Sequence, residues 1–280
     1  FMVPFERQIT LKKGQKCVLV LLGDIHWNLD ACNHQLFDDL IYMLADHRKH
    51  KDLVRVIGMG DYVDCFSTSE RDALAGIHDS SLEQLDKWVM ELMQKLARKL
   101  EPLKGCVDGL LEGHHWHKFE GPDTRDSEGK RLYGVSSTEY FCKLLDAQYL
   151  GLMTMGTWHI NGYPLRLLAH HGYGFARSKP GKIRKRTALA DEWISDIYAL
   201  GHEHALFIEE DDQIAQAGKG IKSHNRYFVG TGSYPRGYSI GTPYGGYVEA
   251  RLLPPNDLGS PIFEISAESK GLKIKAWPFK

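Results

Sequence analysis

The sequence predicts an α/β protein in which two packed mixed sheets are flanked by helices, giving a four-layer α/β/β/α sandwich. The first half of the chain alternates apolar, strand-like runs with segments of helical spacing, whereas the second half consists mostly of strand-like runs. This pattern suits two sheets that share one core and carry helices on their outer faces. No interdomain linker interrupts the 280 residues, so we expect one domain over residues 1–280.

The first half of the chain supplies the expected alternation. Residues 16–23 form a near-continuous apolar run that ends in Gly, which is typical of a strand buried on both faces. Apolar residues then recur at helical spacing from about Asn33, and they do so again in a segment that stops near Pro102. Further strands are expected at residues 53–59 and near residues 105–112.

The second half is predicted to be richer in strands. Residues 118–133 are polar, charged and rich in turn-forming residues, so we expect a long surface loop there. A helix is expected from Thr138 to about Leu145. Residues 155–169 are predicted to form a hairpin with Asn161-Gly162 as its turn. The remaining strands are expected near residues 196–200, 205–209, 226–230, 245–252, 261–266 and 271–277.

Composition excludes several classes of protein. A formal net charge of -1 argues against a general nucleic-acid coat protein and against a polybasic membrane binder. No apolar run approaches the roughly 20 residues of a membrane span. The five cysteines are odd in number and lack a Cys-x-x-Cys motif, which indicates reduced thiols rather than a disulfide framework. No signal peptide is visible, and we therefore expect a cytoplasmic protein with no membrane partner.

Five short motifs rich in Asp and His occur in order along the chain. They are Asp24-Ile25-His26, Gly60-Asp61-Tyr62-Val63-Asp64, Gly113-His114-His115, His170-His171-Gly172 and Gly201-His202-Glu203-His204. Asp and His side chains hold divalent cations, and open α/β sheets place their sites at the carboxyl ends of strands. A single motif of this kind is usually a turn or a helix cap. The five in this order predict an enzyme with two metal ions.

The motif order resembles that of the calcineurin-like metallophosphoesterase superfamily, and in particular its bacterial and phage-type members that are similar to DNA-repair exonucleases. That family shows Asp-x-His, Gly-Asp-x-x-Asp, Gly-Asn-His-Asp/Glu, a lone His and Gly-His-x-His in this order. The resemblance covers residues 23–204, about two thirds of the chain. It implies a single metallophosphoesterase domain that hydrolyses phosphate esters by attack of a hydroxide bridging two divalent cations.

The resemblance also implies which side chains bind the cations. The ligands of one cation would be Asp24, His26, Asp61 and His204, and those of the other would be Asp61, His114, His170 and His202. Asp61 would bridge the two cations, because a carboxylate offers an anionic oxygen to both. At the fourth motif both His170 and His171 are available, and the family pattern favours His170, the first of the pair.

The third motif departs from the family pattern. Asn is usual where His114 stands, and an acidic residue is usual where Trp116 stands. Imidazole is a softer ligand than an amide oxygen, so we expect manganese, with zinc or iron as alternatives, rather than magnesium. The resemblance implies that His115 contacts the phosphate or protonates the leaving oxygen, and that Asp64 orients a ligand. We therefore expect His115, Asp61 and Asp64 to be catalytic.

Two further segments are candidate substrate-binding regions. A basic cluster just after the fourth motif is suited to hold phosphates next to the scissile one, and its alternative interpretation is a solvated loop. Its members are Arg177, Lys179, Lys182, Arg184, Lys185 and Arg186. Arg236, Tyr234 and Tyr238 lie in a Gly- and aromatic-rich stretch, where Arg236 is suited to bind a phosphate and Tyr234 or Tyr238 to stack on a base. The alternative interpretation of this stretch is a simple turn. The few carboxylates and the nearby basic cluster favour a phosphodiester, so DNA, RNA or a nucleotide is the expected substrate.

A non-catalytic scaffold with the same fold is the main alternative to an enzyme. Some members of the superfamily keep the fold, lose metal ligands and serve as interaction platforms. In this chain every ligand position holds a residue that is able to bind a cation. The sequence therefore favours a phosphodiesterase, nuclease or phosphatase over a scaffold.

Overall fold

The computed structural model describes residues 2–65, 79–217, 220–238, 247–250 and 252–280. In these residues the strands form two six-stranded sheets, each of which mixes parallel and antiparallel pairs. The strand order in the first sheet is β1 (Phe5–Ile9), β6 (Met153–Ile160), β7 (Tyr163–His170), β8 (Ile197–Leu200), β10 (Gly220–Thr231) and β9 (Leu206–Ala217). The order in the second sheet is β12 (Gly271–Phe279), β11 (Ser260–Glu268), β2 (Cys17–Leu22), β3 (Leu53–Gly58), β4 (Val107–Leu110) and β5 (Gln148–Tyr149).

The two sheets pack face to face over an apolar core. Leu19 and Leu21 of β2 belong to this core together with residues of the other sheet such as Trp158 and Leu167. The alternate residues of β2, for example Val20, are buried on the opposite face, among residues of the helices. Burial of β2 on both faces explains why its sequence is a near-continuous apolar run.

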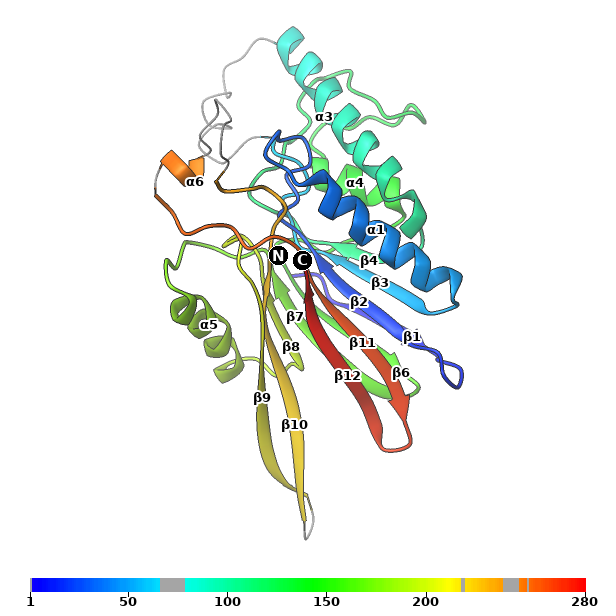
Figure 1. Ribbon diagram of the computed structural model, residues 1–280. Coiled ribbons are helices and arrows are strands. Elements are labelled where there is room, and N and C mark those ends of the chain that lie inside the picture. Colours follow the sequence, from blue (N-terminus) through cyan, green and yellow to red (C-terminus); the bar gives the residue numbers. More distant parts are fainter. Residues whose placement is uncertain (1, 66–78, 218–219, 239–246, 251) are drawn as a thin grey trace.

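Helices cover the outer face of each sheet (Figure 1). Asn33 caps the first helix by accepting a hydrogen bond from Leu36 N, and Ser136 and Glu139 form a capping box at the start of another. The helices on the second sheet are α1 (His34–Lys49), α3 (Asp79–Lys99) and α4 (Ser137–Leu145), and those on the first are α5 (Lys179–Thr187) and the 3-10 turn η2 (Ala188–Asp191). The expected four-layer α/β/β/α sandwich is therefore confirmed.

Most of the expected elements occur, with a few differences. β6 and β7 form the expected hairpin, and Asn161 and Gly162 of its turn both have positive φ angles. The expectation of a strand at 245–252 is wrong for residues 247–250, which form the short helix α6 (Tyr247–Ala250), while residues 245–246 and 251 lie outside the described residues. Strands β1 and β5, helix α5 and the turn η1 (Glu101–Leu103) were not expected.

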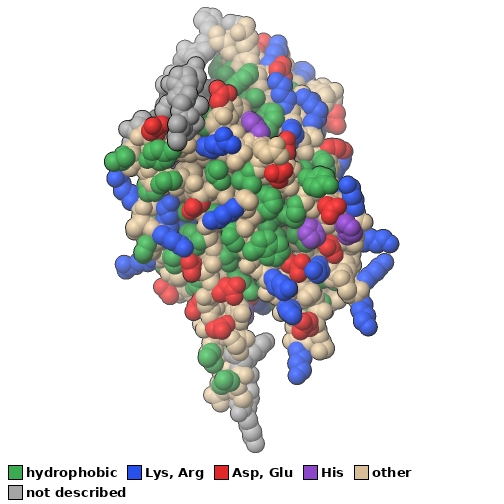
Figure 2. Space-filling view, viewed as in Figure 1, with side chains coloured by type: hydrophobic (Ala, Val, Ile, Leu, Met, Phe, Trp, Pro, Cys, Tyr) green, Lys and Arg blue, Asp and Glu red, His purple; other side chains and the backbone are tan. Residues whose placement is uncertain are grey.

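Strands β9 and β10 form a hairpin that extends beyond the rest of the molecule (Figure 1). Their pairing reaches from Leu206–Thr231 to Ala217–Gly220, well past the expected strands at 205–209 and 226–230. On the face drawn in Figure 2, Lys and Arg side chains are interspersed with Asp and Glu rather than gathered in one patch. Among the helices of the described residues, none is both long and apolar enough to cross a membrane.

The expected loop at 118–133 has no helix and no strand longer than an isolated bridge. Asp86, a buried residue of α3, holds the loop in place. Its Oδ2 accepts hydrogen bonds from Gly121 N at 2.8 Å and from Thr124 Oγ1 at 2.6 Å. Its Oδ1 lies 2.6 Å from His117 Nε2. These contacts tie the loop to α3 just after the third Asp/His motif.

Candidate metal centre

The five motifs meet at one edge of the two sheets. Asp24, Asp61 and His114 follow the parallel strands β2, β3 and β4, and His171 and His202 follow the parallel strands β7 and β8 of the other sheet. The two sets are joined directly, because His202 N donates a hydrogen bond to Asp24 Oδ2 at 3.0 Å. This carboxyl edge is where α/β sheets commonly bind their ligands.

The backbone at this edge adopts a conformation that side chains other than Gly rarely take. Asp24, His26, Asp61, His202 and His204 all have φ angles between 44° and 66°. The left-handed region costs a residue with a Cβ atom about 1–2 kcal/mol. Such residues cluster where the surrounding structure imposes the conformation for a functional purpose. The same five residues carry candidate ligand atoms, so the conformation is linked to the site.

Gly113 makes room for Asp61. A Cβ atom at Gly113 would lie 2.0 Å from Asp61 Oδ1, so no larger residue fits without moving that carboxylate. The same oxygen accepts hydrogen bonds from the backbone N–H groups of His114 at 2.6 Å and His115 at 2.8 Å. The third motif therefore fixes the Asp61 carboxylate through its backbone as well as contributing a side chain to the site.

One group of candidate ligands consists of Asp61, His114, His171 and His202. Their ligand atoms all lie within 4.8 Å of one another. His171 Nε2 is 3.1 Å from Asp61 Oδ2, and the Nδ1 atoms of His114 and His202 are 3.0 Å apart. Three imidazoles and one carboxylate form a mixed donor set that suits zinc, iron or manganese better than magnesium.

A second group consists of Asp24, His26 and His204, whose ligand atoms also lie within 4.8 Å of one another. His204 Nε2 is 3.4 Å from Asp24 Oδ1. Asp61 Oδ2, which faces His171 in the first group, also lies 3.8 Å from His26 Nε2. A single carboxylate oxygen therefore faces both groups, as a bridging ligand must.

The geometry differs from the expectation that His170 is a ligand, because His171 and not His170 lies in the cluster. Successive side chains of β7 alternate between its two faces, and His170 follows Leu168, which packs on the outer face. His170 is partly exposed and its Nδ1 accepts a hydrogen bond from Gly172 N at 2.7 Å. His171 follows Ala169 on the inner face and is only 2% exposed.

Asp64 lies next to two histidines at the edge of the cluster. Its Oδ1 contacts His115 Nδ1 and is 3.4 Å from His26 Nδ1. Asn28 fixes the backbone of Asp64, since Asp64 N donates to Asn28 Oδ1 at 2.7 Å and Asn28 Nδ2 donates to Asp64 O at 2.9 Å. Burial lowers the pKa of His115, but Asp64 and Asp61 outweigh that effect and leave it above its usual value. A carboxylate behind a histidine is a common means of fixing its orientation.

Several buried polar atoms of the cluster have no hydrogen bond of normal geometry with the described residues. They are Asp24 Oδ1, Asp64 Oδ1, both ring nitrogens of His26, His115 Nδ1 and His171 Nε2. Most of these atoms face one another as carboxylate–imidazole pairs, for example His171 Nε2 and Asp61 Oδ2 at 3.1 Å. Buried carboxylates and imidazoles that gather without regular hydrogen bonds are expected to have a ligand. Carboxylate oxygens and imidazole nitrogens that converge in this way fit divalent cations.

The electrostatics of the cluster point the same way. Burial raises the pKa of Asp61, but His171 and His26 hold it well below its usual value, so the carboxylate is ionised. Burial lowers the pKa of His171, yet Asp61 and Asp24 raise it to about 9. The pKa of His202 falls to about 4 because it is buried and lies near His171. The carboxylates thus attract positive charge, and cation binding would displace the His171 proton.

A cavity of about 480 Å³ opens beside the cluster, within the range of about 300–1,000 Å³ that ligand pockets span. Its lining includes His26, Asp61 and His115 on the side of the metal cluster and Phe175 and Arg177 elsewhere. Phe175 was not expected, because it lies in a segment that carries no ligand motif. The only sequence signal for Arg177 is its place at the start of the basic cluster that follows the fourth motif.

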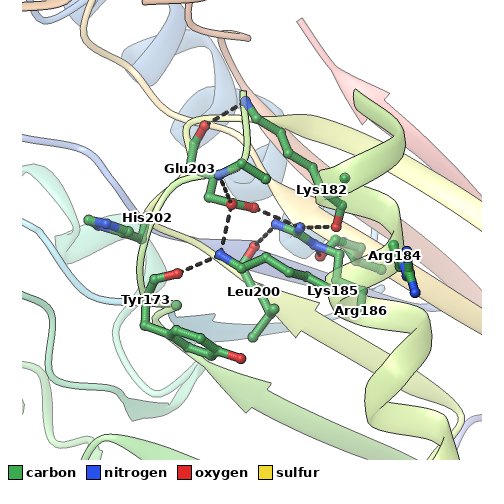
Figure 3. A network of polar contacts seen from close by, with 12 residues as sticks. Tyr173, Lys182, Arg184, Lys185, Arg186, Leu200, His202 and Glu203 are labelled. Carbon is green, nitrogen blue, oxygen red and sulfur yellow. Dashed lines mark hydrogen bonds and ion pairs between the residues drawn. The ribbon is translucent and has the colours of Figure 1, made fainter. Parts of the chain in front are cut away.

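All members of the basic cluster except Arg177 lie in helix α5, and several of them bond inside the protein (Figure 3). Arg186 is fully buried, where it donates to Glu203 Oε2 at 3.0 Å and to three backbone carbonyls. Lys185 Nζ donates to Glu203 Oε1 at 2.8 Å. Arg184 is exposed and points away from this network. The expectation that Arg186 contacts substrate is therefore wrong, because its guanidinium is enclosed by the protein. Neither Lys185 nor Arg184 lines the cavity.

The second candidate substrate-binding segment lies near the cavity without lining it. Arg236 and Tyr238 are both exposed. Tyr238 OH donates to Leu253 O at 2.6 Å, and Leu253 does line the cavity. Tyr234, in the same stretch, is fully buried and hydrogen-bonds with Ser260. A role of Arg236 and Tyr238 in substrate binding stays a prediction.

Comparisons with known proteins gave the following results. No protein-family model matches the chain, and no curated protein matches it. Similar solved structures include Zn-complexed Vps29 from Entamoeba histolytica, with 14% identity, 94% of this chain and 99% of that chain covered, and a TM-score of 0.32. Another is a predicted phosphoesterase from Streptococcus pneumoniae, with 11% identity, 94% and 90% coverage, and a TM-score of 0.34. A third is vacuolar protein sorting 29 from Cryptosporidium parvum, with 11% identity and a TM-score of 0.35. The match covers 95% of this chain and 99% of that chain.

The candidate site is defined by the geometry of the chain itself. Its two mixed sheets pack between helices as expected. Its Asp and His motifs end at one edge and gather into the two ligand groups and an adjoining third set of His26, Asp64 and His115. The order of these motifs is what the chain shares with the calcineurin-like metallophosphoesterase superfamily, which it resembles.

Proposed function

We propose that the protein is a metal-dependent hydrolase of phosphate esters. The observation that carries this proposal is that Asp61 Oδ2 lies between two ligand groups, 3.1 Å from His171 Nε2 and 3.8 Å from His26 Nε2. A carboxylate shared by two cation sites is the arrangement on which two-metal hydrolysis depends. The cavity beside the groups supplies the space in which an ester substrate would bind.

The residues present fit two divalent cations. One would be held by Asp24, His26, Asp61 and His204, and the other by Asp61, His114, His171 and His202. Bound there, the cations would neutralise charge on a phosphoryl group and lower the pKa of water. Manganese is our first choice because it accepts both carboxylate and imidazole ligands, with zinc and iron as alternatives.

His115 is the proposed proton donor to the leaving oxygen. It lines the cavity, and its Nδ1 contacts Asp64, which leaves Nε2 as the nitrogen available to a substrate. Its raised pKa favours the protonated ring that a general acid needs. Asp64 is the proposed positioning residue, because one of its oxygens faces both His115 and His26.

A phosphodiester is the proposed substrate class. Asp24 and Asp61 are the only carboxylates of the two ligand groups, so two divalent cations would leave the site with a net positive charge. Such a site binds an anionic ester and stabilises the charge that grows on the phosphoryl oxygens during hydrolysis. The basic cluster contributes less than the sequence suggests, since Lys185 and Arg186 are paired with Glu203.

Turnover of bis-p-nitrophenyl phosphate tests this function. The purified protein with added manganese is expected to release p-nitrophenol, to lose this activity on treatment with a chelator and to regain it when metal returns. A protein that binds manganese but shows no turnover on this diester or on p-nitrophenyl phosphate would contradict the proposal and favour the scaffold alternative.

A further inference from the structure

The part of the cavity wall that lies outside the metal cluster has its own chemistry. Phe175, Leu253 and Pro254 supply apolar surface, and Arg177 and Asn256 supply the polar groups. A cavity of about 480 Å³ holds more than the few atoms of a phosphoryl group. The ligand is therefore expected to have an organic part that meets this wall while its phosphate meets the metal cluster.

Arg177 differs from the other cations near the cavity. Lys185 and Arg186 are paired with the Glu203 carboxylate, and Lys182 Nζ donates to Glu203 O at 3.0 Å. Arg177 is exposed, lines the cavity, and has no hydrogen bond or ion pair to a described residue. Its guanidinium is thus free to pair with a phosphate oxygen, for which its planar set of donors is well suited.

Phe175 presents an aromatic ring to the cavity with one face already occupied. Lys182 Nζ lies over the ring at 5.4 Å from its centroid, and Lys182 is itself buried. The ring remains 44% exposed and lines the cavity, so it can be reached by a ligand there. A ring supported on one face and open on the other is a suitable surface for stacking a planar group such as a nucleobase.

Glu203 holds these two residues close to the metal ligands. Ala176, which lies between Phe175 and Arg177 in the chain, donates its N–H to Glu203 Oε1 at 2.8 Å. Glu203 in turn lies between the candidate ligands His202 and His204 in the chain. The segment is therefore tied to the turn that carries the ligands, and an ordered wall loses less entropy when a substrate binds.

We propose that Phe175 and Arg177 form a substrate-binding wall for the nucleoside arm of a phosphodiester. Phe175 packs against the base, and Arg177 pairs with a phosphate oxygen. This proposal rests on the proposed phosphoesterase function and adds a substrate class to it. It replaces Arg184, Lys185 and Arg186 as the basic residues that contact the substrate.

The test compares two diesters with the same leaving group, thymidine 5′-(p-nitrophenyl phosphate) and methyl p-nitrophenyl phosphate, in the manganese-loaded protein. Phe175→Ala is expected to lower kcat/KM for the thymidine ester about tenfold, because base–aromatic stacking is lost, and to leave the methyl ester nearly unchanged. Tyr173→Ala is the matched control, since Tyr173 is an exposed aromatic residue of the same segment that does not line the cavity.

Arg177→Gln is expected to lower kcat/KM for both esters about tenfold, because both share the phosphate that the guanidinium would bind. Arg184→Gln removes the same charge from an exposed position that does not line the cavity, and it is expected to leave both rates unchanged. Two results would contradict the proposed substrate-binding wall. One is equal slowing of both esters by Phe175→Ala, and the other is an equal effect of Arg177→Gln and Arg184→Gln.

Binding separates failure of the wall from failure of the proposed function. The dissociation constant of thymidine 5′-monophosphate is measured by calorimetry on the manganese-loaded protein and the same four variants. If the protein hydrolyses neither ester, the proposed phosphoesterase function is wrong. The dissociation constants then remain as the test of whether Phe175 and Arg177 bind the ligand. Weaker binding by Phe175→Ala and Arg177→Gln than by their controls supports the substrate-binding wall, and unchanged binding by both refutes it.

Discussion

Two polar clusters lie side by side at the carboxyl edge of the sheets, and they are built in opposite ways. Around Asp61, buried carboxylate oxygens and ring nitrogens lack normal hydrogen bonds, and several residues have left-handed backbone angles. Around Glu203, one carboxylate oxygen accepts from Ala176 N and Lys185, and the other accepts from Arg186. We expect the first cluster to bind a ligand, whereas the second already has its charges and hydrogen bonds paired and stabilises the fold.

Three consecutive residues connect the two clusters. His202 and His204 turn toward the proposed metal site, while Glu203 turns toward Lys185 and Arg186. Within this one turn, we expect His202 and His204 to bind metal and Glu203 to stabilise the fold. Substitutions in the Asp61 cluster should affect metal binding and catalysis, and substitutions in the Glu203 cluster should affect folding.

The largest effect is expected for Asp61→Asn. The amide cannot give an anionic oxygen to two cations, so turnover should fall by at least about a thousandfold and the bound metal should fall below two ions per chain. Activity on bis-p-nitrophenyl phosphate and elemental analysis measure both quantities. Near-wild-type turnover with two ions bound would rule out the bridging role.

Glu203→Gln should act on stability instead. It leaves the fully buried Arg186 without a charged partner, and breaking a buried ion pair costs about 3–5 kcal/mol of unfolding free energy. Glu209→Gln is the control, because its contact with Lys179 lies on the surface and is expected to contribute about 0–1 kcal/mol. Urea unfolding measures the free energy of unfolding of both variants. Similar losses of unfolding free energy in the two would contradict a special structural role of the Glu203 cluster.

His115→Ala tests the proton donor at the border of the metal cluster. It should keep both cations, because His115 is outside the two proposed ligand sets, and slow hydrolysis of alkyl esters about a hundredfold. Esters of p-nitrophenol should be slowed much less, since that leaving group departs without a proton. Comparison of kcat for the two ester types decides the matter, and equal slowing would mean that His115 donates no proton.

The smallest effect is expected for His170→Ala. His170 lies in neither ligand group, so the variant should keep metal content and turnover near those of the wild type. His171→Ala, one residue along, should lose metal from the site that it shares with Asp61. The opposite ranking of the two variants in elemental analysis would restore His170 as the ligand.

The parts of the fold that depend on local patterns were predictable from the sequence. The apolar run of β2, the cap at Asn33 and the Asn161-Gly162 turn each have a local physical signal. Helix α5 has a weak signal because its sequence is strongly basic. Its formation depends on a cap at Ser178 and on the pairing of Lys185 and Arg186 with Glu203, which the sequence does not reveal.

The candidate site was predictable as a set of motifs but not in every member. The order of the motifs led to Asp24, Asp61 and His202, whereas the choice between His170 and His171 depends on which face of β7 each residue takes as the strand ends. Arg186 was expected to face solvent because charged residues are rarely buried. Arg186 is buried because it pairs with Glu203, which is distant in the sequence. Only the folded structure shows this pairing.

Anomalous X-ray scattering from crystals grown with manganese is the most direct test of the account. We expect two peaks within about 4 Å of each other, one bounded by Asp24, His26 and His204 and the other by His114, His171 and His202, with Asp61 between them. A single peak, or peaks away from Asp61, would contradict the central claim that this carboxylate joins two metal sites.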